Sequence, residues 1–424
     1  MDDIVWPPKT HNQPKSEHED KMPLSKTEDE PAANQTTKPE ETIDMSKDKP
    51  GDSIKPTDSK PPKSKDKSGK VRWWQLRRKN LSRKQWILLS IALVLAIGAA
   101  SAGGFYLYKH LTKVKNSAAV IKAKGPIKPT TVPSKLTGLP VDPSVNSRQV
   151  TAVMIENSPD ARPQSGLISA GVVYEAIAEG GITRFMALYQ AEQPDYIGPI
   201  RSVRPYYLDF LMPYDAAVAH VGGAPQALSD IKSLGVKDLD QFANGNYYTR
   251  ITARYAPHNV YSSIAQFNKL EASKGYTTSN YTGFPRKKDA PAKVPTARTV
   301  DLAISGYLYN VHYDYDVATN AYKRSEGGSP HTDEKSGTQL EPKVVVALVM
   351  SRGIDSDGQH TDYTTSGSGA MYVFQDGLVT QGTWHKADRK SQFSFTDANG
   401  KVLKLNAGQT WISIVDPNTV TYKP

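Results

Sequence analysis

The chain has 424 residues, a formal net charge of +10 and no cysteine. The positive excess does not lie in the C-terminal part, because residues 149–424 carry 26 Lys and Arg against 27 Asp and Glu, a net charge of −1. This distribution excludes a nucleic-acid-binding fold, which carries its basic patch inside the folded region. The lack of cysteine excludes a disulfide framework and lipid attachment through an N-terminal cysteine.

Residues 1–85 are rich in Lys, Asp, Glu, Pro, Ser and Thr and show almost no periodic apolar pattern. A segment of this composition buries too little apolar surface to offset its conformational entropy, so we predict a disordered tail. Its charge is divided: residues 1–50 carry 7 basic and 12 acidic side chains, whereas residues 51–85 carry 12 and 3. We expect the basic part to lie against an anionic membrane surface.

Residues 86–108 (WILLSIALVLAIGAASAGGFYLY) follow, 23 residues without a charged side chain. A helix of this length spans roughly 34 Å, enough to cross a hydrocarbon core of about 30 Å. Seven cations lie between residues 70 and 85, and the heavier Lys/Arg flank stays in the cytoplasm. We predict a single-pass protein of the cell membrane, with a cytoplasmic N-terminus and extracytoplasmic C-terminal domains. The alternative is a cleaved signal peptide, whose charged region would begin at the N-terminus.

Residues 109–147 are rich in Lys, Pro and Thr, which predicts an extracytoplasmic stalk in an extended conformation. After the stalk, apolar residues recur with the spacing of strands in some segments and with the spacing of helices in others. They predict strands at residues 149–155, 172–178, 184–189 and 216–221, and helices at 206–212, 225–234 and 262–274, the last capped by Ser262 or Ser263. This mixture predicts an α/β or α+β ligand-binding domain over residues 148–282.

Residues 283–298 (GFPRKKDAPAKVPTAR) are charged and contain three prolines, so we predict a linker there. Short apolar runs follow, with breaks that include Asp376-Gly377 and Asn399-Gly400, pairs typical of tight hairpin turns. Residues 299–424 are therefore predicted to form a mainly antiparallel β domain. The fold class of the whole chain is mixed, with one transmembrane helix and a disordered tail.

The strongest candidate for a functional cluster in the predicted exported part is GPIRSVRP, residues 198–205. Arg201 and Arg204 lie three residues apart, just before a predicted helix whose first backbone N–H groups favour an anion. Guanidinium groups bind phosphate or carboxylate through paired hydrogen bonds. The pattern predicts an anion-binding pocket. The alternative, which the sequence leaves open, is that these arginines stabilise the fold by pairing with Glu175, Glu179 or Asp209.

Four further arginines and two polar residues are expected to converge on this pocket: Arg162, Arg184, Arg250, Arg254, His258 and Asn259. Arg250 and Arg254 are four residues apart, a spacing that places them on one side of a strand or a helix. If four of these arginines share one cleft, ordinary salt bridges explain them poorly. We include all six residues in the candidate ligand-binding site.

Carboxylates at strand ends and histidines beside turns are the available catalytic groups: Glu175, Glu179, His220 and His258, with Glu156 in a similar position. A carboxylate paired with an imidazole could act as general acid and base. No nucleophile elbow, HExxH or phosphate-cradling glycine-rich loop occurs. We therefore predict no cofactor, and the sequence favours a binding protein over an enzyme.

Two weaker patterns lie in the second half. His331 and Asp333 have the spacing of metal ligands, but two such residues on a polar loop are common by chance, so we predict no metal site. Trp384 and Trp411 could stack on sugar rings, although tryptophans in apolar strands more often belong to the core.

Five longer stretches point to a family: residues 162–185 (RPQSGLISAGVVYEAIAEGGITRF), 197–210 (IGPIRSVRPYYLDF), 255–261, 380–386 and 405–415. Together they resemble the YerB-like family of candidate bacterial envelope lipoproteins, defined by paired N- and C-terminal domains of unknown function (domain of unknown function 3048). The resemblance implies a Gram-positive, extracytoplasmic setting and two exported domains, and supplies no established activity. The chain departs from the lipoprotein pattern through its apolar helix and long N-terminal tail.

We therefore expect an envelope protein that binds an anionic wall polymer, or a cell-wall protein, through its arginine cluster. One alternative is a hydrolase or transferase acting on an envelope glycan or phosphate ester. Another is a scaffold whose tail recruits cytoplasmic partners to cell-wall machinery. The membrane is an expected partner and nucleic acid is not, and the sequence leaves the oligomeric state open.

Overall fold

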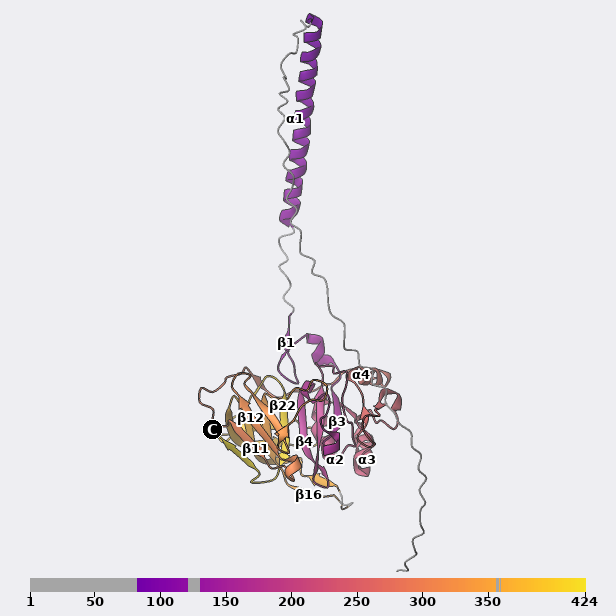
Figure 1. Ribbon diagram of the computed structural model, residues 1–424, viewed down its shortest axis with the longest axis vertical. Coiled ribbons are helices and arrows are strands. Elements are labelled where there is room, and N and C mark those ends of the chain that lie inside the picture. The colour runs from indigo at the N-terminus through magenta and orange to yellow at the C-terminus, as the bar shows by residue number, and fades with distance from the viewer. Residues whose placement is uncertain (1–81, 121–129, 356–357, 359) are drawn as a thin grey trace, which may run out of the picture. The chain divides into compact units, whose positions relative to one another are not determined.

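The computed structural model describes residues 82–120, 130–355, 358 and 360–424 (Figure 1). Nearly all of the predicted disordered tail lies outside these residues. The first helix, α1, runs from Arg83 to Val120 and contains the predicted apolar helix. Its part from Arg83 to Thr112 is long and apolar enough to cross a membrane, judged by length and composition.

The predicted stalk contains regular structure at both ends. α1 continues through residues 109–120, because no Gly or Pro interrupts this stretch and most of its residues tolerate a helix. After residues 121–129, which lie outside the described part, strands β1 (Val132–Pro133) and β2 (Pro140–Val141) form a small hairpin. Leu136 between them is buried in the main core, so the folded region begins before residue 148.

The largest element is a ten-stranded mixed sheet with the order β20-β19-β18-β15-β22-β4-β5-β3-β6-β7. The first half of the folded region, residues 130–282, supplies β3 (Thr151–Glu156), β4 (Val172–Glu179), β5 (Ile182–Tyr189), β6 (Ala217–Ala219) and β7 (Lys237–Asp238). The second half supplies β15 (Val344–Val349), β18 (Gly367–Gln375), β19 (Leu378–Lys386), β20 (Ser394–Asp397) and β22 (Thr410–Val415).

The two halves meet at β22, which pairs in parallel with β15 on one side and with β4 on the other. All six residues of β22 are buried, as expected for a central strand covered on both faces. Residues 283–298, predicted as a linker, therefore do not separate two independent sheets. Within that stretch β10 (Arg286–Lys287) pairs in parallel with β21 (Leu405–Asn406).

A second, antiparallel sheet has the order β14-β13-β12-β11-β23 and lies within the part predicted to be antiparallel. Its strands are β11 (Thr299–Leu302), β12 (Val311–Asp316), β13 (Ala321–Glu326), β14 (Ser329–Pro330) and β23 (Val420–Lys423). Val300 and Tyr313 of this sheet pack against Val345 and Phe374 of the larger one. Two small hairpins complete the strands: β8 (Thr249–Arg250) with β9 (Val260–Tyr261), and β16 (Arg352–Ile354) with β17 (Thr361–Tyr363).

Helices cover both faces of the larger sheet where the first half of the folded region supplies its strands. α2 (Pro205–Leu211) and α3 (Pro225–Leu234) pack on one face, and α4 (Ile264–Ser273) packs on the other. Ser263 caps α4, since its Oγ accepts a hydrogen bond from Gln266 N (3.2 Å), as predicted.

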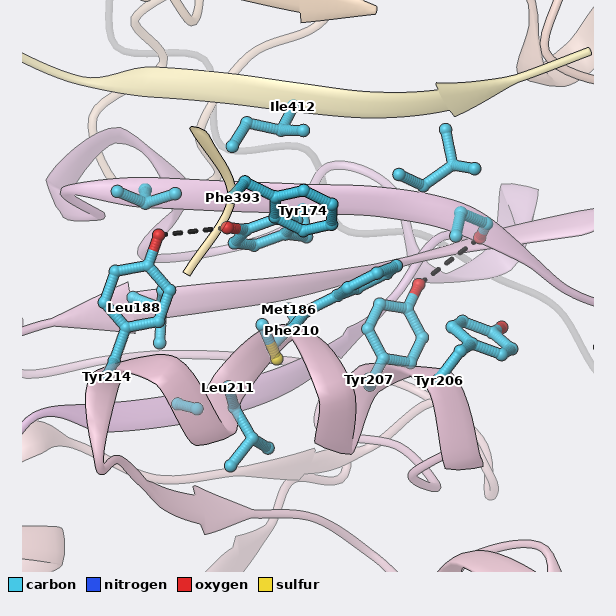
Figure 2. Packing of buried hydrophobic residues seen from close by; sticks show 14 of the residues in the cluster. Tyr174, Met186, Leu188, Tyr206, Tyr207, Phe210, Leu211, Tyr214, Phe393 and Ile412 are labelled. Carbon is cyan, nitrogen blue, oxygen red and sulfur yellow. Dashed lines mark hydrogen bonds between the residues drawn. The ribbon is translucent and has the colours of Figure 1, made fainter. Parts of the chain in front are cut away.

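Aromatic side chains from both halves fill the first face (Figure 2). Tyr174 stacks on Phe210 with ring centroids 5.1 Å apart, and its ring centroid lies 6.4 Å from that of Phe393. The hydroxyl groups of Tyr174 and Tyr214 form a hydrogen bond (2.9 Å), which gives each of these two buried polar groups a partner. One continuous core therefore holds both halves together.

Candidate anion-binding cleft

The segment between β5 and α2 runs along the end of β3. Ile200 forms a bridge with Ile155, and the Arg201 N–H donates to the Met154 carbonyl (2.9 Å). The chain then passes close to Gly223, where a Cβ would lie 2.7 Å from Val203 Cγ1, so this approach requires glycine. The path brings Arg201 beside Glu156 at the end of β3 and directs Arg204 toward the end of β4.

Arg204 and Arg184 are both buried and share one carboxylate, that of Glu179. Arg204 donates to its Oε2 through Nε (3.0 Å) and Nη2 (2.6 Å), and Arg184 Nη2 donates to its Oε1 (2.6 Å). Burial alone would raise the pKa of Glu179, but the two guanidinium groups lower it below its usual value. Arg204 Nη1 donates to the Val203 carbonyl, so no nitrogen of this guanidinium lacks a partner. Arg184 and Arg204 therefore agree with the alternative that these arginines stabilise the fold, with Glu179 as their counter-ion.

Arg201 is placed differently. Its Nε lies 3.2 Å from Glu156 Oε1, and its side chain is 23% exposed. Within the described residues, no hydrogen bond occupies its Nη1 or Nη2. Because these terminal groups carry most of a guanidinium's donors, Arg201 retains donors for a ligand.

Arg250 lines the same cleft as Arg201. Its Nη1 donates to Asn259 Oδ1 (3.0 Å), and no carboxylate of the described chain forms an ion pair with it. The cleft encloses about 530 Å³, and its lining includes Arg201, Gly222, Gly223, Asp240, Phe242 and Arg250. The lining itself holds two guanidinium groups and one carboxylate, that of Asp240, and Glu156 behind Arg201 offsets part of this positive charge. Arg250 is therefore the cation of the lining that has no carboxylate partner among the described residues.

Glu156 and His258 form a pair beside the cleft. Glu156 is buried, and its Oε2 lies 3.0 Å from His258 Nδ1. Ser158 Oγ donates to Glu156 Oε1 (3.0 Å) and also lies 3.3 Å from His258 Nδ1. Both contacts of the imidazole use Nδ1, and the atom nearest to Nε2 among acidic groups is Asp160 Oδ2, 4.0 Å away. Glu156 Oε2 accepts no hydrogen bond from the described residues, so its 3.0 Å contact with His258 Nδ1 is an ion-pair contact. The arrangement differs from that of a nucleophilic triad, in which serine faces Nε2.

Arg162 and Arg254 are bound within the fold. Arg162 Nη2 lies 3.3 Å from Glu326 Oε1. Arg254 donates to two backbone carbonyls, from Nη1 to Asp160 and from Nη2 to Pro163, both at 2.8 Å. Neither residue belongs to the lining of the cleft.

Glu175, a catalytic candidate from the sequence, lies in a buried network between the two sheets. Its Oε1 accepts from Arg324 Nη2 (3.0 Å) and its Oε2 accepts from Trp411 Nε1 (2.9 Å). Arg324 Nε donates to His331 Nδ1 (2.9 Å), because burial and Arg324 lower the pKa of His331 and keep its imidazole neutral. Burial raises the pKa of the neighbouring Glu326 to about 7. Glu175 therefore serves as a buried counter-ion.

His220, another catalytic candidate, is buried under the loop that carries Asp240. Its Nδ1 lies 2.8 Å from the Gly222 carbonyl, and its Nε2 lies 3.0 Å from Asp238 Oδ1. Asp238 Oδ1 also accepts from Asp240 N (2.8 Å), and Asp240 Oδ1 accepts from Gly222 N (3.0 Å). His220 thus positions one wall of the cleft and does not line it.

The tryptophans and the His331–Asp333 pair that the sequence singled out in the second half are buried in the folded region. Trp384 is buried and donates from Nε1 to the Val349 carbonyl (2.9 Å), and Trp411 is fully buried, as the core alternative predicted. His331 and Asp333 are buried as well. Among the residues that the structure describes, no group of three or more His, Asp or Glu side chains is arranged to hold a metal.

The sequence-predicted site is therefore divided. Arg201 and Arg250 line one cleft. Asn259 accepts a hydrogen bond from Arg250, and His258 contacts Glu156, which pairs with Arg201. The other four arginines bind groups within the fold. The sequence did not single out Asp240 or Phe242. Asp240 precedes the turn at residues 241–243 and belongs to no motif, and Phe242 follows no periodic pattern, so only the folded loop shows that both belong to the cleft.

Two family models match this chain: Protein of unknown function (DUF3048) N-terminal domain over residues 136–277, and the corresponding C-terminal domain over residues 300–412. The chain is also 32% identical over 285 residues to YerB of Bacillus subtilis (strain 168), described as a candidate lipoprotein; the match covers 66% of this chain and 85% of YerB. The chain belongs to the YerB-like family. The predicted resemblance is thereby confirmed.

A crystal structure of the YerB protein from Bacillus subtilis is similar to this chain, with a TM-score of 0.62 at 30% identity. The similarity covers 70% of this chain and all of the YerB structure. Every lining residue of the cleft falls within the part matched by the N-terminal family model. The cleft therefore lies in the part of the chain that the N-terminal family model matches, outside the N-terminal tail and α1.

Proposed function

We propose that this chain is a single-pass protein of the cell envelope that binds an anionic wall polymer in the cleft at Arg201 and Arg250. The observation that carries the proposal is that two guanidinium groups line one cleft and keep donors that the described fold does not use. Phosphate and carboxylate are the anions whose geometry matches a guanidinium fork.

The charges around the cleft favour binding without disruption of the fold. Arg201 is partly neutralised by Glu156, whose Oε1 lies 3.2 Å from Nε, and no hydrogen bond from the described residues occupies its terminal nitrogens. Among the residues that the structure describes, the Arg250 side chain is bound by the neutral Asn259 and by no carboxylate, so an incoming anion displaces no carboxylate of this part of the chain. A hydrogen bond to a charged group contributes roughly 1.5–3 kcal/mol.

Calorimetric titration of the full chain in detergent with inorganic phosphate tests this proposal. We expect Arg250→Gln to weaken phosphate binding by about tenfold or more, since one charge-assisted contact is lost. Arg298→Gln is the matched control, because Arg298 is also exposed and lies outside the cleft. Equal phosphate affinity of Arg250→Gln and the wild type would rule the cleft out as the anion site.

The anchoring part of the proposal is supported by α1 and by the family. YerB is described as a candidate lipoprotein, whereas this chain contains no cysteine for lipid attachment and has an apolar helix before its folded region. A helix of about 20 apolar residues holds a protein in a membrane far more firmly than a single lipid chain. We infer that α1 replaces the lipid as the anchor.

A second candidate function, hydrolysis of a phosphate ester, is favoured by the contact between Glu156 Oε2 and His258 Nδ1 (3.0 Å). A carboxylate on Nδ1 orients an imidazole so that Nε2 can accept a proton from water. Ala256 and Pro257, just before His258, line the cleft. Incubation with glucose 1-phosphate should then release inorganic phosphate from the wild type and not from His258→Asn. A wild-type protein that releases none is a binding protein only.

A further inference from the structure

Phe242 is an unusual residue in the cleft, because it lines the wall and yet is 74% exposed. Its loop is held firmly on both sides of the ring. Gln241 N donates to the His220 carbonyl (2.9 Å), and Asn244 Nδ2 donates to the Asp240 carbonyl (2.7 Å). An aromatic ring on a hydrogen-bonded loop loses little conformational entropy when it meets a ligand.

The ring has a defined position beside the glycine turn. A Cβ on Gly222 would lie 3.1 Å from Phe242 Cε2, so the edge of the ring rests close to the Gly222 backbone. Gly222 also has φ of +58°, and its N–H donates to Asp240 Oδ1 (3.0 Å). Phe242, Gly222 and Asp240 are therefore fixed relative to one another.

Phe242 and Asp240 offer a ligand different contacts from those of Arg201 and Arg250. The face of an aromatic ring carries partial negative charge and attracts the weakly positive C–H groups of a sugar. Asp240 uses Oδ1 for Gly222, and no hydrogen bond from the described residues reaches its Oδ2, which can accept from hydroxyl groups. A cleft of about 530 Å³ is within the size range of small-ligand sites.

We infer that the cleft binds a phosphorylated sugar, with the phosphate at Arg201 and Arg250, the sugar ring on Phe242 and a hydroxyl group at Asp240. The inference rests on the proposed function and specifies its ligand class. A purely anionic ligand would leave Phe242 and Asp240 without a role. A neutral sugar would leave the two arginines without one.

The test is calorimetric titration of the full chain with three probes: inorganic phosphate, glucose 1-phosphate and glucose. Wild-type protein should bind glucose 1-phosphate about tenfold or more tightly than phosphate, and glucose more weakly than either. Phe242→Ala should lower the affinity for glucose 1-phosphate to that for phosphate, and Phe242→Trp should keep the difference. Tyr307→Ala is the matched control, since Tyr307 is 69% exposed and lies outside the cleft.

The outcomes separate the two proposals. If phosphate and glucose 1-phosphate bind equally, or if Phe242→Ala keeps the preference for the sugar phosphate, the assignment of a sugar is overturned while anion binding stands. If neither phosphate nor glucose 1-phosphate binds, both proposals fall. Tighter binding of glucose than of glucose 1-phosphate also overturns the inference, because the arginines would then contribute nothing.

Discussion

Arg201 and Arg204 show how different two neighbouring arginines can be. They lie three residues apart, but Arg204 turns toward the carboxylate of Glu179, whereas Arg201 keeps its terminal nitrogens at the cleft. The difference depends on which carboxylate lies within reach after folding. Glu179 is a residue of β4, and its contact with Arg204 exists only because the chain between them folds back along β3.

The three-residue cluster of Glu179, Arg184 and Arg204 predicts a large loss of stability for Glu179→Gln. Removing the charge leaves two buried guanidinium groups without a counter-ion, which we expect to cost roughly 2 kcal/mol or more. Glu179 itself is 29% exposed, so the cost should stay below that of a fully buried pair. Thermal unfolding at pH 7 should show a lower melting temperature than for Asp160→Asn, whose parent side chain is 83% exposed.

The same cluster predicts that the stability of the protein depends on pH. Because the folded-state pKa of Glu179 is lowered, its stabilisation is present above the usual glutamate value of 4.5 and is lost as the pH falls through the folded value. The difference in melting temperature between the wild type and Glu179→Gln should therefore be full at pH 7 and shrink toward pH 3. A difference that stays constant over this range would show that Glu179 does not act through its charge.

Elements with local signals were predicted well. The helix at 225–234 coincides with α3, the cap at Ser263 is present, and Asp376-Gly377 forms the turn between β18 and β19. Each of these depends on residues close together in sequence. The partners of β22 were not predicted, because its pairing with β4 joins Trp411 to Val173 and no local pattern encodes a pairing over that separation.

Glu175 on β4 and Arg324 on β13 form an ion pair between the two sheets, and substitutions of the two residues test how much this pair stabilises the fold. Arg324→Met should destabilise the protein by about 3–5 kcal/mol, because it leaves the buried Glu175 carboxylate without its cation. Adding Glu175→Gln should recover part of the loss, since the remaining group is neutral. Chemical denaturation of both variants measures this. A double variant less stable than Arg324→Met alone would contradict the assignment of Glu175 as a counter-ion.

At the scale of the whole molecule, the shared sheet makes the two halves interdependent. Without residues 299–424, β4 would expose its long apolar edge, and Tyr174 would lose Phe393. We expect residues 130–298 alone to show no cooperative thermal unfolding, whereas residues 130–424 unfold in one transition. Circular dichroism of the two fragments measures this. Cooperative unfolding of the shorter fragment would restore the independent first domain that the sequence predicted.

The sequence predicted only part of the candidate site, because contacts between distant residues decide which arginines are available to a ligand. Charge and spacing identified Arg201, Arg250, His258 and Asn259, all of which lie at or beside the cleft. The same criteria also selected arginines that the fold neutralises, because sequence shows a cation but not its counter-ion. Phe242 could not be found at all, since an exposed aromatic residue in a turn has significance only next to the groups that surround it.

The absence of cysteine allows the proposed topology to be tested with single introduced thiols. Ser144 is exposed in the folded region, and Ser68 precedes the seven-cation flank of the apolar helix. If α1 crosses the membrane with its basic flank inside, a membrane-impermeant maleimide should label Ser144→Cys in intact cells and label Ser68→Cys only after lysis. Labelling of Ser68→Cys in intact cells would place the tail outside and reverse the orientation. Labelling of neither until lysis would mean that the cleft never meets the cell wall.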